Sequence, residues 1–230
     1  MAFVKTEVQG AVEIITIDRP KALNALNPEV LADLKAAFEA VDQDAIRCIV
    51  LTGEGDKSFV AGADIGSMST MTKAEGEAFG KLGNDVFLMI EHFPIPVIAA
   101  VNGFALGGGN ELAMSCDIRI CSDNAVFGQP EVGLGITPGF GGTQRLARLV
   151  GMGMAKQLVY SALNIKADEA YRIGLVNAVY PQAELMENVL KLANKIAKNA
   201  PIAVRNCKKA INDGISLPIE KAVEVEEKLF

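Results

Sequence analysis

Residues 97–111 read Val-Ile-Ala-Ala-Val-Asn-Gly-Phe-Ala-Leu-Gly-Gly-Gly-Asn-Glu, and this stretch decides the predicted fold. The wholly apolar run Val97–Val101 predicts a strand buried on both faces, as in a parallel sheet covered by helices. Three glycines and a predicted helix around Asn110–Ala113 follow. Glycines let a substrate approach the backbone closely. Because they are contiguous, they do not form the spaced GxGxxG fingerprint of dinucleotide binding.

The flanking sequence predicts alternating strands and helices. Before the quoted stretch, β-branched runs at 4–8 and 11–17 predict a hairpin that turns at Gly10. Asn27-Pro28 predicts the N-cap and first residue of a helix, and a strand at 48–51 follows it. A long helix is predicted over 72–93, and the prolines at 94 and 96 end it.

After the quoted stretch, a strand is predicted at 118–121, and beyond Gly141 the chain is predicted to be helical except for a strand at 175–179. Lys-rich helices, restarted at Pro201, follow residue 195. The expected organisation is therefore an α/β core over 1–195 and a helical C-terminal region over 196–230.

Composition excludes several classes of function. The chain has 230 residues, of which half are apolar, and a net charge of −6, which argues against a general nucleic-acid or acidic-membrane surface. We find no signal peptide and no apolar run long enough to cross a membrane. Four cysteines without metal-binding spacing favour the reducing cytoplasm. The single histidine, His92, lies far in sequence from the glycines, so Ser or Cys nucleophilic catalysis is disfavoured.

Most of the candidate catalytic residues lie at or after these glycines. If Gly108 begins the helix, its N–H is an unpaired donor for an oxygen that gains negative charge, and Glu111 returns to the same face one turn later. A tight packed turn and a Glu that merely stabilises the helix dipole remain the alternatives. Glu131 lies in an apolar loop rich in Gly and Pro, a setting that raises a carboxyl pKa, although it could also be a surface charge. Ala63 offers a second N–H, and Asp64 is expected to cap the next helix.

These motifs resemble the enoyl-CoA hydratase/isomerase (crotonase) superfamily from residue 11 to the end. The residues that carry the resemblance are Asp18-Arg-Pro-Lys-Ala-Leu-Asn-Ala-Leu26, Ala61-Gly-Ala-Asp-Ile65, Ala100-Val-Asn-Gly-Phe-Ala-Leu-Gly-Gly-Gly-Asn-Glu-Leu112, Cys116-Asp-Ile118 and Pro138-Gly-Phe-Gly-Gly-Thr-Gln-Arg-Leu146. The stretch 133–156 looks most like bacterial short-chain crotonases that act as 3-hydroxybutyryl-CoA dehydratases. The resemblance implies a spiral of strand-strand-helix units followed by helices.

The resemblance also assigns roles to individual residues. It places the oxyanion hole at the N–H groups of Ala63 and Gly108, and makes Glu111 and Glu131 the catalytic pair. Related isomerases usually keep an acid at only one of these places, so the pair favours a hydro-lyase. Further substrate contacts are implied at Ala61, Gly62, Asp64, Ile65 and Gly107, with Lys21 as a phosphate or ribose contact; a solvated loop lysine is equally compatible with the sequence.

The expected reaction is reversible syn addition of water to a short 2-enoyl-CoA, crotonyl-CoA above all, without a metal or separate cofactor. Isomerisation, dehalogenation or decarboxylation on the same scaffold, and a catalytically silent or RNA-associated homologue, are the alternatives. A homo-oligomer, either a trimer or a hexamer, is expected from the family.

Two departures from the family pattern stand out. Position 110 is Asn where many relatives have Cys, and little effect is expected. The family usually continues for about thirty residues past Phe230, which suggests a truncated chain with a more open cleft.

Overall fold

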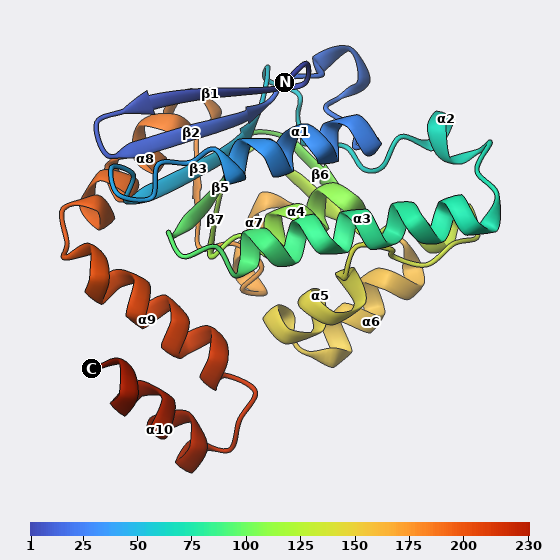
Figure 1. Ribbon diagram of the computed structural model, residues 1–230. Helices are drawn as coiled ribbons and strands as arrows, with labels where there is room; N and C mark the ends of the chain where they lie inside the picture. The colour runs from blue at the N-terminus through green and yellow to red at the C-terminus, as the bar shows by residue number, and fades with distance from the viewer.

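The computed structural model describes residues 1–230, which form two β-sheets and the helices around them (Figure 1). The larger sheet has the strand order β1-β2-β3-β5-β7-β10, with bounds Val4–Gln9, Val12–Ile17, Cys48–Gly53, Val97–Val101, Ile118–Ser122 and Ala178–Tyr180. The smaller sheet has the order β4-β6-β8-β9, with bounds Ser58–Val60, Phe104–Leu106, Val126–Gly128 and Asn164–Lys166. The helices are α1 (Pro28–Glu39), α2 (Ile65–Met68), α3 (Lys73–Glu91), α4 (Gly108–Ser115), α5 (Gly142–Val150), α6 (Met152–Ser161), α7 (Ala167–Arg172), α8 (Leu185–Ala197), α9 (Pro201–Gly214) and α10 (Ile219–Leu229).

Successive segments of the chain repeat one unit. Each unit sends one strand to the larger sheet and the next strand to the smaller sheet, and ends with a helix: β3-β4-α3, then β5-β6-α4, then β7-β8-α5. Within the larger sheet only the β1–β2 hairpin is antiparallel, and in the smaller sheet only the β8–β9 pair is. The expected spiral of strand-strand-helix units is confirmed.

The central strands β2, β3 and β5 of the larger sheet are buried on both faces because their side chains alternate between two cores. In β3, Ile49 and Leu51 join the main core between the sheets, whereas Cys48 and Val50 point to a second core beneath α8. This alternation is the two-residue period of a strand, in which successive side chains lie on opposite faces. The prediction that β5 is buried on both faces is confirmed in the same way.

Local signals set the helix ends as predicted. The Asn27 side chain accepts a hydrogen bond from Val30 N (2.8 Å), and Pro28 is the first residue of α1. At α3, Thr72 and Glu75 satisfy each other's backbone N–H groups in a capping box. The helix ends at Glu91, just before the two prolines.

Two sequence expectations need correction. The strand expected at 175–179 forms only over Ala178–Tyr180, because the N–H groups of Leu175 and Val176 donate to Ala170 O in α7 instead of to β7. The region after Gly141 also contains β9, which was expected to be helical. The smaller sheet as a whole was not predicted.

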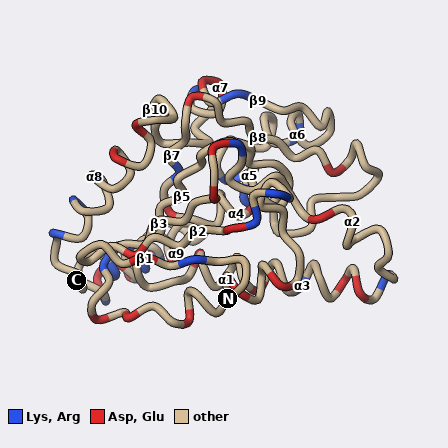
Figure 2. The backbone as a smooth tube through the Cα atoms, turned by 90° about the horizontal axis from the view of Figure 1, so that it is seen from above, with Lys and Arg blue, Asp and Glu red and all other residues tan.

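The last two helices extend away from the sheets as a pair (Figure 1). They are tied to the core where Lys208 on α9 reaches Asp117 across 2.7 Å. Seen from above, basic and acidic residues are interspersed along the tube (Figure 2). No helix in the structure combines the length and the apolar character that crossing a bilayer requires.

Candidate active site

The turn between β6 and α4 requires glycine at its first position. Gly107 has φ = +49°, a conformation that side chains other than that of glycine rarely adopt. A Cβ at Gly107 would also lie only 2.8 Å from Glu131 Oε1. Gly109 is equally constrained, since a Cβ there would collide with the carbonyl of Val60. The glycines therefore let α4 begin directly against β4 and beside Glu131.

Two backbone N–H groups are free to act as donors beside this turn. Gly108 is the first residue of α4, so its N–H has no partner within the helix. Ala63 forms a parallel bridge with Leu26, in which Leu26 N donates to Gly62 O (2.8 Å) and Asp64 N donates to Leu26 O (2.7 Å). Because neighbouring residues face opposite ways along an extended chain, the Ala63 N–H points away from that bridge.

Both donors and both glutamates line one cleft of about 490 Å³. Of the residues expected from the sequence, the cleft is lined by Ala61, Gly62, Ala63, Ile65, Gly107, Gly108, Glu111 and Glu131. Glu111 and Glu131 are its only charged residues, and much of the remaining wall is apolar. The structure thus brings together the residues that oxyanion and acid/base chemistry would need.

Asp64 and Lys21 lie outside this cleft. The Asp64 side chain caps α2 by accepting from Ser67 N (3.3 Å) and pairs with Arg19 (2.7 Å), whose hydrogen bond lowers the Asp64 pKa. Capping is therefore its role in the fold. Lys21 is exposed in the short 3₁₀ turn Pro20–Ala22 and lines a separate hollow with Lys57 and Asp56. Its contact with a nucleotide stays a prediction.

Glu111 is buried, and two backbone N–H groups near the start of α5 hold its carboxylate. Its Oε1 accepts hydrogen bonds from Phe140 N (3.0 Å) and Gly142 N (2.6 Å). Burial, reinforced by the negative charge of Glu131, raises the Glu111 pKa to about 7, against the pull of these two N–H donors and of Arg145. A carboxyl with this pKa exchanges protons readily near neutral pH.

Glu131 begins the 3₁₀ turn Glu131–Leu134 and is also buried. Its Oε1 accepts one hydrogen bond, from Gln129 Nε2 (3.3 Å), and its Oε2 has no partner in the protein. Burial raises its pKa. Since the Glu131 charge also raises the Glu111 pKa, the two carboxyls act as a pair that favours one shared proton over two negative charges.

Sequence reasoning missed the residues that hold this pair in place. The Phe140 ring packs edge-on against Phe79 (centroids 5.2 Å apart) and Phe87 (5.5 Å), which fixes the N–H groups that hold Glu111. Gln129 is fully buried and donates to Glu131, while Asn110 donates to Gln129 (2.9 Å). A fully buried Gln two residues before a candidate acid was not distinguishable from other polar loop residues in the sequence.

The single histidine and the cysteines do not line the cleft. His92 is exposed at the end of α3, as expected from the sequence. Cys48, Cys116 and Cys121 are buried, and burial raises the pKa of each thiol to about 12. The side chains form no cluster of three or more potential metal ligands. Glu111 and Glu131 are therefore the only carboxyl groups placed to exchange protons in the cleft.

Burial of Glu111 predicts a measurable effect on stability. Its folded-state pKa of about 7 lies above its ordinary value of 4.5, so the free energy of unfolding falls as pH rises from 4.5 to 7 and stays low above 7. Glu111→Gln keeps the acceptor oxygen but cannot ionise. We expect it to unfold with about 1–3 kcal/mol more free energy than the wild type at pH 8, and with a similar free energy at pH 4.5. Urea unfolding at both pH values measures this, and a gap independent of pH would contradict the assignment.

Comparisons with known proteins agree with this geometry. The family model for enoyl-CoA hydratase/isomerase matches residues 7–230. The chain is 60% identical to the short-chain-enoyl-CoA hydratase of Clostridium acetobutylicum over 225 residues, which cover 97% of this chain and 86% of that protein. It is 56% identical to the crotonyl-CoA hydratase of Syntrophomonas wolfei, with the same coverage.

A crystal structure of a relative has the same fold as this chain. The crystal structure of an enoyl-CoA hydratase from Bacillus anthracis superposes with a TM-score of 0.97 at 38% identity and covers 99% of this chain and 89% of that one. Sequence and structure therefore agree along nearly the whole chain. The protein belongs to the enoyl-CoA hydratase/isomerase family.

Proposed function

We propose that this protein is a hydro-lyase that adds water reversibly to short-chain 2-enoyl-CoA thioesters, with crotonyl-CoA as the favoured substrate. The observation that carries the proposal is the pair of buried glutamates in one cleft with two free N–H donors. The proteins at 60% and 56% identity, named for short-chain enoyl-CoA and crotonyl-CoA hydration, support this choice of substrate. Loss of crotonyl-CoA absorbance on adding purified protein tests it, and an inactive protein would overturn it.

The N–H groups of Ala63 and Gly108 would hold the thioester carbonyl oxygen. Donors fixed in a dry cleft stabilise the negative charge that gathers on that oxygen as the enolate forms, and each is worth about 3 kcal/mol. Polarisation through the carbonyl makes Cβ electron-poor. No covalent bond to the protein is needed.

The two glutamates would divide the proton transfers. In hydration, Glu111 removes a proton from water as the oxygen bonds to Cβ, and Glu131 delivers a proton to Cα as the enolate collapses to the thioester. Water therefore gains its Cβ bond and loses one proton, while Cα gains one. Because both acids line the same cleft, addition to one face of the double bond, syn addition, is expected. Dehydration follows the reverse path.

The assignment of Glu111 as the base predicts the sign of the pH dependence. The base must be ionised in the free enzyme, and the Glu111 pKa is about 7. We expect kcat/KM for hydration to fall with the ionised fraction below pH 7, because kcat/KM reports the free enzyme. In Glu131→Gln the midpoint of this limb should move to lower pH, since the Glu131 charge raises the Glu111 pKa. A rate that is full at pH 5 and falls above pH 7 would instead make Glu111 the acid.

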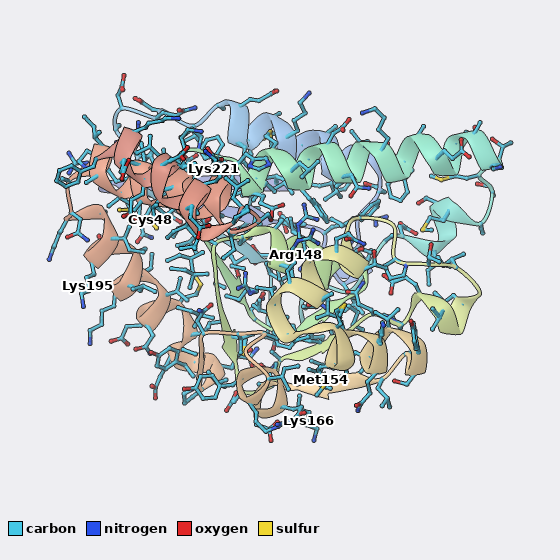
Figure 3. All side chains as sticks on the ribbon, turned by 90° about the horizontal axis from the view of Figure 1, so that it is seen from below. Cys48, Arg148, Met154, Lys166, Lys195 and Lys221 are labelled. Carbon is cyan, nitrogen blue, oxygen red and sulfur yellow. The ribbon has the colours of Figure 1, made fainter.

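We also propose that the protein assembles as a trimer or hexamer of identical subunits. Large apolar side chains are exposed on α6, α9 and α10 and at their ends: Met152, Tyr160, Ile202, Ile211, Ile215 and Ile219. Figure 3, in which Met154 marks α6 and Lys221 marks α10, shows these helices from below. Exposed apolar surface of this kind is typical of a subunit contact.

Light scattering tests the assembly directly. A trimer or a hexamer of the 24.4 kDa chain is expected, because burial of the apolar residues on α9 and α10 against a neighbour removes them from water. Ile215 is 79% exposed, and Ile215→Asp should weaken the assembly. Lys221→Asp, at an exposed charged position of α10, provides the control. A wild-type protein that is monomeric at micromolar concentration would refute this proposal.

A further inference from the structure

The stretch 139–142 carries the two N–H groups that hold Glu111, and it is tied to α3 at three points. Asn84 Nδ2 on α3 donates to Gly139 O (2.8 Å). The Phe140 ring packs edge-on against two phenylalanines of the same helix. The third tie is an arginine of α5 that an acid at the end of α3 holds in place.

This arginine, Arg145, binds two partners at once. Its Nε and Nη2 both donate to Glu91 Oε2 (2.9 and 2.7 Å), and its Nη1 donates to Phe140 O (2.9 Å). The Arg145 side chain is only 9% exposed, so water has little access to these contacts. A guanidinium is planar, and its donors point in fixed directions. Glu91 therefore sets the direction in which Arg145 reaches Phe140.

The carbonyl that Arg145 binds belongs to the peptide group between the two donors. Phe140 N lies in the preceding peptide group and Gly142 N in the following one, and both donate to Glu111 Oε1. Because each peptide group is planar, fixing the central one restricts both neighbours. Gly141 leaves room for this contact, since it has φ = +92° and a Cβ there would collide with Arg145 Nη1.

Few charged groups face Glu111. Glu131 faces it across the cleft and Arg145 acts on it from α5, where the Arg145 charge lowers the Glu111 pKa against the effect of burial. The other basic residue of α5, Arg148, is exposed. Of the other elements packed against α4, β4 and β6 carry no charged residue, and the charged residues of α3 apart from Glu91 are exposed. Arg145 is therefore the basic residue placed to favour ionised Glu111.

We propose that Arg145, held by Glu91, is a positioning residue for Glu111. It keeps both backbone donors directed at Oε1 and supplies a positive charge behind them. Oε2 of Glu111 accepts no hydrogen bond within the protein and is left to take the proton from water. This inference rests on the proposed function, in which Glu111 is the base. Without Arg145 the donors loosen and the charge is lost, and both changes favour the protonated carboxyl, which cannot act as a base.

Carboxyl NMR of the full chain labelled with ¹³Cδ-glutamate tests this effect without any substrate. The Glu111 signal is identified by its loss in Glu111→Gln, and its midpoint in the wild type is expected near pH 7. In Arg145→Met, which fills a similar space without a charge, the midpoint should rise by about half a pH unit or more. An unchanged or lower midpoint would overturn the proposal.

Two variants serve as matched controls. Lys208→Met removes another buried cation that binds both a carboxylate, Asp117 (2.7 Å), and a backbone carbonyl, Ile95 O (3.3 Å), but does not line the cleft. Arg148→Met removes an exposed positive charge from the same helix as Arg145. Neither should move the Glu111 midpoint measurably. A rise in either control equal to that in Arg145→Met would show that Arg145 has no special role.

A second variant keeps the test decisive if Arg145→Met does not fold. The double variant Glu91→Gln/Arg145→Met removes both members of the ion pair, so no carboxylate is left without its partner. The Glu111 midpoint should still rise, because the charge that acts on Glu111 is that of Arg145. A double variant that folds and keeps the wild-type midpoint would refute the proposal.

Kinetics separates this inference from the proposed function. In Arg145→Met, kcat/KM for crotonyl-CoA hydration should fall by an additional factor of about threefold or more at pH 6 relative to pH 9, because the ionised fraction of the base falls as its midpoint rises. If the wild type does not hydrate crotonyl-CoA, the proposed function is wrong, whatever the carboxyl signal does. If it does, and the Glu111 midpoint is the same in the wild type and Arg145→Met, the role of Arg145 alone is wrong.

Discussion

Glu111→Gln and Glu131→Gln should each lower kcat for crotonyl-CoA hydration by about 10²–10⁴-fold, the usual contribution of a general acid or base. Glutamine preserves the size of each side chain and one acceptor oxygen, so the amide introduced by Glu111→Gln would still be positioned by the N–H groups of Phe140 and Gly142. Only the ability to exchange a proton is lost. KM should change by less than about tenfold, because the substrate's binding contacts are kept.

A matched control separates this loss from the general effect of removing a buried charge. Glu13 on β2 is 7% exposed and its pKa is raised by burial, but it lies on the larger sheet and does not line the cleft. Glu13→Gln should hydrate crotonyl-CoA at the wild-type rate. Near-normal turnover in either Glu111→Gln or Glu131→Gln would refute the role assigned to that residue.

Removing the Gly108 N–H should lower kcat/KM by at least about 10²-fold, the effect of losing one donor to a developing oxyanion. Gly108→Pro does this, because proline has no N–H and is well accepted at the first position of a helix. The proline ring also occupies the space into which the N–H pointed. Steady-state kinetics on crotonyl-CoA, with circular dichroism to check folding, measures the effect.

Gly108→Ala is the matched control for this variant. Its Cβ would lie 3.1 Å from Phe140 Cδ2 and 3.3 Å from Leu26 Cδ1, a crowding that both variants share, but alanine retains the N–H and adds no ring atoms beside it. The activity of Gly108→Ala should therefore lie well above that of Gly108→Pro. Equal activity in the two variants would exclude Gly108 as an oxyanion donor.

Strong local signals made much of the larger sheet predictable. The hairpin, α1 and α3 follow from β-branched runs, from the Asn27-Pro28 cap and from apolar residues at helical spacing. The smaller sheet was missed because each of its strands has only three residues, too few for a two-residue period to be visible. Its pairs, such as Ser58 with Phe104, join segments far apart in the chain and depend on the spiral itself.

Only part of the candidate site could likewise be predicted from the sequence. Glu111 could be placed relative to Gly108 because both lie within the first turn of one helix. Its proximity to Glu131 was reached only through family resemblance, since the two strands β7 and β8 and their connections separate α4 from that residue in the chain. The burial of Asn110 and its hydrogen bond to Gln129 were not anticipated from the sequence. Sequence spacing cannot show that contact, because it forms only when the residue after β8 folds against α4.

The stereochemical course of the reaction in D₂O tests the central claim most directly. Purified enzyme would be mixed with crotonyl-CoA in D₂O, and the early 3-hydroxybutyryl-CoA product examined by NMR for the position of deuterium at Cα relative to the hydroxyl at Cβ. If Glu111 and Glu131 act from one cleft on one face of the double bond, the product should carry a single deuterium, syn to the hydroxyl. Anti addition, deuterium scrambled between both Cα positions, or migration of the double bond without a hydroxyl would contradict the account.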